Sequence, residues 1–345
     1  PSLHNCVDVL CVSDPSGKRV GSGGGTLNAI DIANKTYGIE FMKSSKTLII
    51  HSGGDSRRAP FHSICGKAWT SLNAHIGSMS ILATPLAILI EELSLLAPYI
   101  PTGSTTVASC DVLLDLKPNS PDEIQFEIPK DGVTIITVPE MPSIAKNHGV
   151  LVLPPERSQL VNRFSISIAE HYLQKPSIET MNAIGAIYTA QNFALIDTGI
   201  VIFAGTALDA MMNLLRDEII QKCTNACNRV SPEELRLELY SDMLLALKIG
   251  SGISNARSLG DFFHCLGLDR KETEIKMGKP VSDYHYALSL LFQYLHGIPL
   301  YMLTVSDGLF CHLGTSKELL ELITCPNVNV TMSLPSPVTT LASFD

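Results

Sequence analysis

"TLIIHSGGDSRRAP", residues 47–60, joins a run of β-forming residues to a turn that carries two adjacent arginines. The apolar run predicts a buried strand, and the glycine pair Gly53 and Gly54 predicts the turn that ends it. Arg57 and Arg58 follow in the same turn. Guanidinium groups bind phosphate oxygens through paired N–H donors, so this turn is a candidate anion site. The alternative is a solvated cluster of surface charge.

Outward from this stretch, apolar runs alternate with amphipathic segments along most of the chain. We expect a strand at Val7–Ser13, a helix that begins near Pro85, and a helix over residues 167–174 that is broken at Pro176. Many expected strands, such as residues 132–139, are continuous apolar runs. Such runs are typical of strands that are covered on both faces. The pattern predicts an α/β fold with a mixed, mostly parallel sheet and helices on both faces, where ligands bind at the carboxyl ends of the strands.

Composition narrows the class of protein. The 345 residues include 25 basic and 34 acidic side chains, so the chain has no general electrostatic attraction for nucleic acid or anionic membranes. Nine cysteines lie scattered without a C-x2-C pair, which favours buried thiols in a reducing compartment and predicts a cytoplasmic protein. The most apolar stretch, residues 81–100, contains Pro85 and the pair Glu91 and Glu92, so no membrane span is expected.

A second glycine cluster, "GSGGGT" at residues 21–26, precedes a helical pattern that runs from about Thr26 to Tyr37. Glycines let backbone amides approach an anion closely, and the start of a helix supplies free N–H groups. We therefore expect a phosphate-binding loop in front of the helix, and the alternative is a tight turn that needs positive φ. The spacing matches neither the P-loop nor the dinucleotide fingerprint.

Further charged side chains surround these two turns. Lys67 follows in "CGKAW", and Lys18 and Arg19 precede the first glycine cluster. Asp111, in "SCDVLLDL", is expected at a strand end, where a carboxylate either caps the next turn or holds a hard cation such as Mg²⁺. Asp242, in "LYSDMLL", taken alone, is expected to be an exposed helix residue.

Other polar residues stand at predicted element boundaries. A lone lysine is usually solvent-facing, and a lone histidine is more often structural than catalytic. They are Asn147 and His148 before a strand, Lys175 before Pro176, Asp197 and Thr198 at a strand start, and His312 before a helix-opening turn. The sequence has no G-x-S-x-G, H-E-x-x-H or kinase signature, so nucleophilic hydrolysis and metalloprotease chemistry have no support.

Taken in order, these pieces resemble the fucose-1-phosphate guanylyltransferases, or GDP-L-fucose pyrophosphorylases. That family includes the pyrophosphorylase part of bifunctional fucokinase/GDP-fucose pyrophosphorylases. The matching motifs include "VSDPSGKRVGSGGGTLNA", "IIHSGGDSRRAP", "SCDVLL", "AKNHGV", "QKPSIETM", "DTGIVIF" and "ELYSDMLLAL", between about residues 6 and 318. "SGGDSRRAP…GK" is also similar to the signature of sugar-nucleotide pyrophosphorylases, with Gly66 where that signature has a proline before the lysine.

The resemblance implies a Rossmann-like, GT-A-like nucleotidyltransferase domain over residues 1–325. It implies that residues 326–345 form a linker or the start of a truncated C-terminal β-helix. The implied reaction forms GDP-L-fucose and pyrophosphate from GTP and L-fucose-1-phosphate, by Mg²⁺-assisted in-line attack on the α-phosphate. A β-helix and a kinase domain are possible fused partners. Two alternatives stay open: another sugar-1-phosphate, such as arabinose-1-phosphate, or a non-catalytic module that binds sugar nucleotides.

The resemblance also implies roles for particular residues. The triphosphate would lie against Gly23 to Thr26, Arg57 and Lys67, and Lys175 would hold the sugar phosphate. The implied catalytic residues are Arg57, Lys67, Asp111 and Lys175, and the implied Mg²⁺ ligands are Asp111 and Asp242. The implied nucleotide-binding residues are Gly21, Ser22, Gly23, Gly24, Gly25, Thr26, Gly53, Gly54, Asp55, His148 and Gly149. The implied substrate-binding residues are Asn147, Lys175, Asp197, Thr198 and Gly199.

Overall fold

The computed structural model describes residues 8–52, 66–72, 84–116, 126–154, 163–188, 192–224, 235–247, 258–266 and 283–317. The glycine–arginine turn of the opening stretch therefore lies outside the described residues. This applies to five predicted site residues or neighbours: Gly53, Gly54, Asp55, Arg57 and Arg58.

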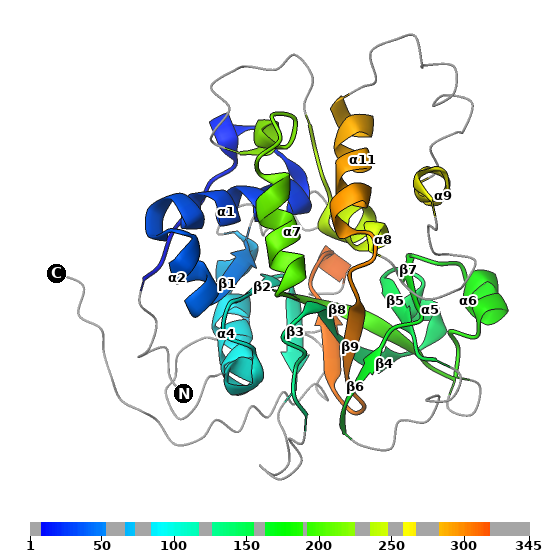
Figure 1. Ribbon diagram of the computed structural model, residues 1–345. Helices are drawn as coiled ribbons and strands as arrows, with labels where there is room; N and C mark the ends of the chain where they lie inside the picture. Colours follow the sequence, from blue (N-terminus) through cyan, green and yellow to red (C-terminus); the bar gives the residue numbers. More distant parts are fainter. Residues whose placement is uncertain are drawn as a thin grey trace, which may run out of the picture.

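An eight-stranded sheet forms the centre of the molecule (Figure 1). Its main path runs in the order β1, β2, β8, β4, β9, β6, and β5 pairs with both β8 and β7. The strands are β1 Lys46–His51, β2 Ser104–Ser109, β4 Gly132–Glu140, β5 Gly149–Val152, β6 Phe164–Ile168, β7 His171–Gln174, β8 Ala194–Ala204 and β9 Leu300–Val305.

The strand directions make the sheet mixed. β1 is parallel to β2, and β4 is parallel to β9. β8 runs antiparallel to β2, β4 and β5, while β6 is antiparallel to β9 and β7 to β5. It follows that β1, β2, β4, β5 and β9 all point one way. The predicted mixed, mostly parallel sheet is confirmed, and the structure adds a reversed strand, β8, at its centre.

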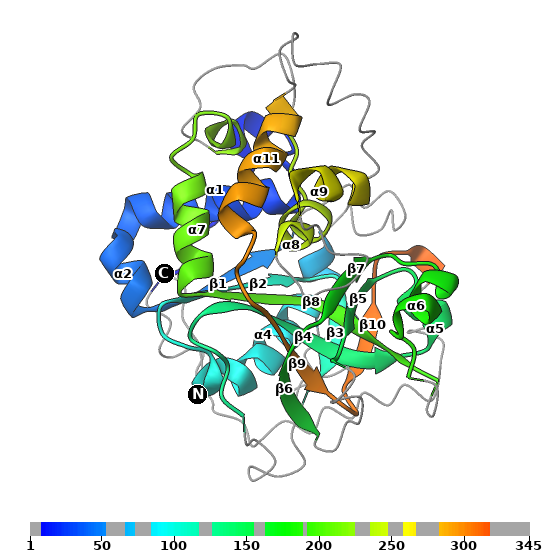
Figure 2. The ribbon, with the colours of Figure 1, turned by 45° about the vertical axis from the view of Figure 1, so that its right-hand side comes forward.

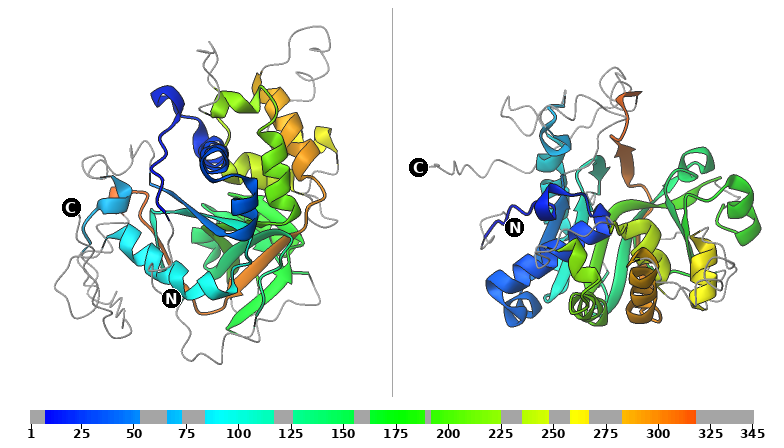
Figure 3. Two further views of the ribbon diagram at one scale, coloured as in Figure 1. Left: turned by 60° about the vertical axis from the view of Figure 1, so that its left-hand side comes forward. Right: turned by 90° about the horizontal axis from the view of Figure 1, so that it is seen from above.

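Helices cover both faces of the sheet, as predicted. Along β8 the side chains alternate: Val201 and Phe203 belong to one apolar core, and Ile200 and Ile202 belong to the other. The first core lies under α1 (Gly21–Tyr37), α7 (Thr206–Leu214) and α11 (Asp283–Leu295), and the second lies over α4 (Pro85–Leu96). Figure 3 shows these two layers on opposite sides of the sheet.

Smaller elements complete the described part of the chain. They are α2 Ile39–Ser44, α5 Pro142–Ala145, α6 Ile178–Ile184, the π-helical turn η8 Leu239–Met243, α8 Leu244–Ala246, α9 Leu259–Cys265, and the 3-10 turns Pro15–Gly17, Lys67–Trp69, Ala97–Tyr99 and Ile220–Cys223. β3 (Val112–Asp115) and β10 (Leu309–His312) form a separate antiparallel pair. In Figure 2, β5, β7, α5 and α6 lie together on one flank of the sheet. None of the helices in the described ranges combines the length and the apolar character needed to cross a bilayer.

Two predictions of local structure are wrong. Residues 8–13 of the expected Val7–Ser13 strand form no strand. Side chains tie this segment to α1 instead: Tyr37 donates to Asp8 at 2.6 Å, and Asn28 donates to the Ser13 carbonyl at 3.1 Å. Residues 167–174 form no helix; they belong to the end of β6 and to β7. Pairing of β6 with β9 and of β7 with β5 satisfies the hydrogen-bonding groups of this backbone in the extended form.

Candidate functional site

Asp111 lies in the turn between β2 and β3, at the carboxyl end of β2. One carboxylate oxygen, Oδ2, is 2.6 Å from Nζ of Lys67 and 3.8 Å from Nε2 of His312. The other oxygen accepts a hydrogen bond from the hydroxyl of Ser109. The Asp111 carbonyl accepts from the Leu313 N–H at 2.7 Å, which fixes β10 beside this turn. Residues more than 40 positions apart therefore meet at one carboxylate.

The charge state of Asp111 follows from these contacts. Burial alone would raise its pKa, but the nearby His312, hydrogen bonds from Lys67 and Ser109, and the charge of Lys67 outweigh burial. The pKa of Asp111 is held well below its usual range, so the carboxylate stays ionised at neutral pH. Because the Asp111 side chain is only 13% exposed, solvent screens this pair weakly.

Gly66 explains how Lys67 reaches Asp111. Gly66 has φ +78°, a left-handed conformation, and it starts a short 3-10 turn over Lys67–Trp69. The hydroxyl of Thr70 donates to the Gly66 carbonyl at 3.1 Å and closes the turn. Proline is fixed near φ −65° and cannot adopt this conformation. The departure from the proline-containing signature therefore reflects a different backbone in front of this lysine.

A second group of predicted residues lies at the start of β5. The ring of His148 meets Phe310 and His312 edge to face, with centroid distances of 5.1 and 5.7 Å. The N–H of Lys175 donates to the His148 carbonyl at 3.0 Å. Because His312 also approaches Asp111, these contacts connect the His148–Lys175 corner to the Asp111 turn. Lys175 has φ +48°, an uncommon conformation for a residue with a side chain.

Gly149 and Asn147 flank this corner. A side chain at Gly149 would place its Cβ 2.8 Å from the hydroxyl of Tyr172, so the glycine permits close packing of β5 on β7. Asn147 lies in the turn between α5 and β5, where its N–H donates to the Ile144 carbonyl at 2.9 Å. Close packing against Tyr172 therefore explains the glycine at position 149. Asn147 lies at the same end of the sheet as His148 and Lys175.

Asp197 is a buried carboxyl group in β8. Burial raises its pKa to about 7, and hydrogen bonds from the Gly199 N–H, at 2.6 Å, and from Tyr172 only partly oppose this. Gly199, with φ +81°, lies against the Asp111 turn, because its Cβ would come within 3.6 Å of Cβ of Ser109. The hydroxyl of Thr198 is fully buried and donates to the Ile136 carbonyl at 2.9 Å, so this side chain stabilises the contact between β8 and β4.

The glycine cluster differs from the expected loop, because the helix begins at Gly21 and not near Thr26. The N–H groups of Gly23 and Gly24 donate to the Leu237 carbonyl at 2.8 and 3.0 Å. A Cβ on Gly23 would lie 2.9 Å from the Met243 sulfur, and one on Gly21 would lie 2.3 Å from the Leu237 oxygen. These glycines let segment 235–238 lie on the helix start, and the two amides are not available as a phosphate cradle.

Ser22 joins the same contact. Its N–H and its hydroxyl donate to Oε2 of Glu238 at 3.2 and 2.6 Å, and its hydroxyl accepts from the Leu239 N–H at 2.9 Å. The side chain of Ser22 therefore fastens the start of α1 to the start of the η8 turn.

Gly25 and Thr26 lie on a different side of α1. A Cβ on Gly25 would face the ring of His51 at 3.4 Å and Oδ1 of Asp14 at 3.9 Å. The hydroxyl of Thr26 lies 2.8 Å from Nε2 of His51. Sequence reasoning missed His51, although its position as the last residue of β1, directly before the glycine turn, is a signal for it.

Asp242 is buried in the η8 turn, so the expectation of an exposed helix residue is wrong. Its oxygens accept from the Glu238 N–H at 2.8 Å, the Ser241 hydroxyl at 3.1 Å and the Tyr284 hydroxyl at 3.3 Å. Burial raises its pKa. Across the described ranges, no group of three or more His, Cys, Asp or Glu side chains is placed to hold a metal, so Asp242 and Asp111 do not meet in such a cluster.

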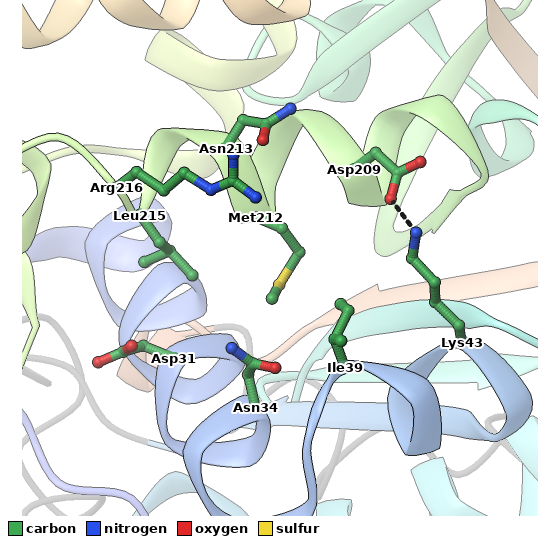
Figure 4. A pocket seen from close by; sticks show the side chains of 9 residues that line it. All are labelled: Asp31, Asn34, Ile39, Lys43, Asp209, Met212, Asn213, Leu215 and Arg216. Carbon is green, nitrogen blue, oxygen red and sulfur yellow. Dashed lines mark ion pairs between the residues drawn. The ribbon is translucent and has the colours of Figure 1, made fainter.

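A hollow of about 520 Å³ lies away from these residues, between α1, α2 and α7 (Figure 4). Ile39, Met212 and Leu215 line it together with an ion pair between Lys43 and Asp209 at 2.8 Å. It contains none of the predicted site residues, so the candidate site is defined by the side chains at the carboxyl ends of β1 and β2.

The protein is therefore an α/β protein with an ionised aspartate, a lysine and histidines at the carboxyl ends of its strands. In α/β folds of this class, ligands bind at that edge of the sheet. Residues 39–343 match the fucose pyrophosphorylase domain model, and the chain belongs to this family. The match ends at residue 343, and the domain boundary expected at residue 325 stays a prediction.

Several curated relatives match the chain. Human fucose-1-phosphate guanylyltransferase is 29% identical over 319 residues, which cover 91% of this chain and 49% of the human protein. The bifunctional fucokinase/GDP-fucose pyrophosphorylase of Arabidopsis thaliana is 30% identical over 59% of this chain and 21% of its own length. The L-fucokinase/L-fucose-1-P guanylyltransferase of Bacteroides fragilis is 29% identical over 70% of this chain and 24% of its own length. The chain thus spans about half the length of the human protein and about a quarter or less of the length of the other two.

Two solved structures align with most of the chain. The inositol-1-phosphate CTP transferase from T. maritima has a TM-score of 0.35 and 8% identity, over 81% of this chain and 95% of that one. UDP-glucose pyrophosphorylase complexed with UDP-glucose has a TM-score of 0.38 and 11% identity, over 81% and 96%. Both TM-scores lie below 0.5, and the fold is defined by the pairing of the strands.

Proposed function

We propose that this chain transfers a guanylyl group from GTP to L-fucose-1-phosphate and releases pyrophosphate. Family membership and the names of the relatives support the choice of reaction. The observation that carries the proposal is the Lys67–Asp111 pair at the carboxyl end of β2, where an ammonium group and an ionised carboxylate lie 2.6 Å apart. Transfer between phosphates needs a cation close to the phosphate oxygens and a carboxylate that can hold a divalent metal ion, both at the same place.

The reaction requires positioning and neutralisation of charge. An oxygen of the sugar phosphate attacks the α-phosphorus of GTP and forms a new P–O bond. The bond from the α-phosphorus to the oxygen that bridges to the β-phosphate breaks, and pyrophosphate leaves with that oxygen. No protein nucleophile is needed, so catalysis rests on orientation and on cations that stabilise the transferred and leaving phosphates. Lys67 would provide one of these cations.

Asp111 suits a divalent cation such as Mg²⁺. It is an oxygen ligand that its neighbours keep ionised, and Mg²⁺ in phosphate-transfer sites commonly takes one or two carboxylates together with phosphate oxygens. When bound, the ion would supply further neutralisation of phosphate charge. Asp242 fits less well, because its oxygens are committed to Glu238, Ser241 and Tyr284. It would need to exchange these contacts to act as the second ligand.

We assign the sugar phosphate to the corner formed by Asn147, His148 and Lys175. The Lys175 side chain is exposed and forms no ion pair within the described residues, so its charge is open to a ligand. The backbone bond to His148 holds it near His312 and the Asp111 turn. Arg57 lies outside the described residues, and its place against the triphosphate rests on the family resemblance alone.

Two further parts of the proposal concern context. The described cysteines are free thiols, and Cys110 and Cys223 are buried, which agrees with the cytoplasm as the site of the reaction. The names of two relatives combine fucokinase with the transferase, so a kinase is the partner domain that we propose for a longer native protein.

The test is pyrophosphate release over a panel of GTP, ATP, CTP and UTP, each combined with L-fucose-1-phosphate, arabinose-1-phosphate and glucose-1-phosphate. We expect the fastest release with GTP and L-fucose-1-phosphate, and a GDP-sugar product of the matching mass. Faster release with another sugar phosphate would replace the substrate assignment. Calorimetric binding of the product GDP-L-fucose without release from any pair would overturn catalysis and favour the non-catalytic module.

A further inference from the structure

His51 ends β1 beside Gly25 and Thr26, and its contacts fix which ring nitrogen carries the proton. The hydroxyl of Thr26 donates to the Ser22 carbonyl at 2.9 Å. A hydroxyl has one proton, so the same oxygen can only accept at its 2.8 Å contact with Nε2 of His51. Nε2 of His51 therefore carries a hydrogen.

The second nitrogen, Nδ1, is then an acceptor. Burial lowers the pKa of His51, and the charges of Asp14, Glu238 and Asp111 oppose this to a smaller extent, so the ring is neutral at neutral pH. In a neutral ring with a proton on Nε2, Nδ1 offers a lone pair. Within the described residues no hydrogen bond reaches Nδ1, which lies 3.8 Å from the position that a Cβ at Gly25 would take.

The surroundings of Gly25 are rich in acceptors. Oδ1 of Asp14 lies 3.9 Å from the same Cβ position, and Asp14 makes no ion pair within the described residues. Glu238 is close enough to act on the charge of His51. Two amides at the start of the helix, those of Gly23 and Gly24, are already bonded to the Leu237 carbonyl. This surface disfavours a triphosphate and favours a ligand group that donates hydrogen bonds.

We propose that Nδ1 of His51 accepts a hydrogen bond from the guanine of the bound nucleotide, and that His51 is a specificity-determining residue. The inference rests on the proposed function. Guanine presents two adjacent donors, N1–H and the 2-amino group, whereas adenine has an acceptor at N1 and no 2-amino group. An acceptor that meets an acceptor is repulsive, so the same contact selects guanine and rejects adenine. This assignment moves Gly25 and Thr26 from the expected phosphate site to the base site.

Ribose hydroxyls are also donors, and the test separates them from the base. We would measure kcat/KM with L-fucose-1-phosphate for GTP, ATP, ITP and 2′-deoxy-GTP in the wild-type protein and in His51→Phe and His51→Asn. Phenylalanine keeps a planar ring without the acceptor. Asparagine can place its carbonyl oxygen near the position of Nδ1.

We expect His51→Phe to lower kcat/KM for GTP by about 10- to 100-fold. We expect kcat/KM for ATP to change by less than about 3-fold, so that the preference for GTP over ATP collapses. His51→Asn should restore part of the preference. The exposed His264 on α9 gives the matched control, and His264→Phe should leave every ratio unchanged. Thermal unfolding of each variant verifies that it folds.

Two results would overturn the inference. One is a parallel loss for GTP and ATP, which would mean that His51 is only structural. The other is a loss of discrimination between GTP and 2′-deoxy-GTP with the GTP/ATP ratio preserved, which would place the contact on the ribose. If no pair of substrates is turned over, calorimetric titration with GTP and ATP measures the same preference without catalysis. Failure of the proposed function is thereby distinguished from failure of this contact.

Discussion

The glycine-rich start of α1 and the turn at Asp111 lie at the same edge of the sheet, yet they are built differently. The Cys110 N–H donates to the His51 carbonyl at 3.2 Å, which joins the two regions. At the start of α1, chain segments pack closely and the amides of Gly23 and Gly24 are bonded within the protein. At Asp111, charged side chains from distant elements converge. Dense glycine here therefore reflects close packing, whereas the strand topology brings the charged side chains together.

The most severe test of this comparison is Asp111→Asn. We expect pyrophosphate release to fall by about 1000-fold, because the amide keeps the shape of the side chain but loses the charge that pairs with Lys67 and suits Mg²⁺. Asp115→Asn is the matched control on β3, and its activity should stay within about 3-fold of the wild type. Equal losses in the two variants would contradict a special role for the Asp111 turn.

Lys67→Met tests the partner cation. We expect a loss of about 10- to 100-fold in kcat/KM, since one positive charge near the phosphates is removed and the apolar stem is kept. Lys130→Met removes a lysine whose side chain is 80% exposed and should leave activity unchanged. An active Lys67→Met protein would mean that the ion pair only stabilises the turn.

Part of this site could be predicted from the sequence. Asp111 was expected at a strand end because an aspartate interrupts an apolar run, and the strand and the turn are both confirmed. His312 was noted only as a polar residue at a boundary. Its approach to Asp111 depends on the antiparallel pairing of β10 with β3, which joins segments almost 200 residues apart and has no local signature.

The glycine cluster shows the opposite limit. Its composition suggested a loop, but a helix tolerates glycines where another segment must approach closely, and that segment, residues 235–238, is remote in sequence. The strand prediction for residues 8–13 was wrong for a similar reason. Its apolar residues suit a strand, whereas hydrogen bonds from Tyr37 and Asn28 place it along α1.

Gly23→Ala and Gly25→Ala separate packing from ligand contact within one helix. A methyl group at Gly23 would lie 2.9 Å from the Met243 sulfur and 3.0 Å from the Leu237 oxygen. We expect the free energy of unfolding to fall by about 1–3 kcal/mol, measured by urea titration. At Gly25 the nearest atom is at 3.4 Å, so stability should hold while KM for GTP rises. The reverse pattern would contradict the division of roles.

Asp197→Asn gives the smallest expected effect and contrasts with Asp111 in its sign. The pKa of Asp197 is raised from 3.8 to about 7, mainly by burial. Between these two values the unfolded chain has released the proton that the folded protein keeps, so stability from this group falls as pH rises through the interval. For Asp111, whose pKa is lowered, stability is instead lost as pH falls below the usual range.

An amide at position 197 cannot ionise, so Asp197→Asn removes the first of these two dependences. We expect the Tm of the variant relative to the wild type to be higher at pH 8 than at pH 5, by about 2 °C or more. Differential scanning fluorimetry over this range measures it, and Asp115→Asn supplies the baseline for an aspartate without the buried environment. A Tm difference that is constant with pH would mean that Asp197 is already ionised at pH 5, and the contrast in sign between the two aspartates would then be lost.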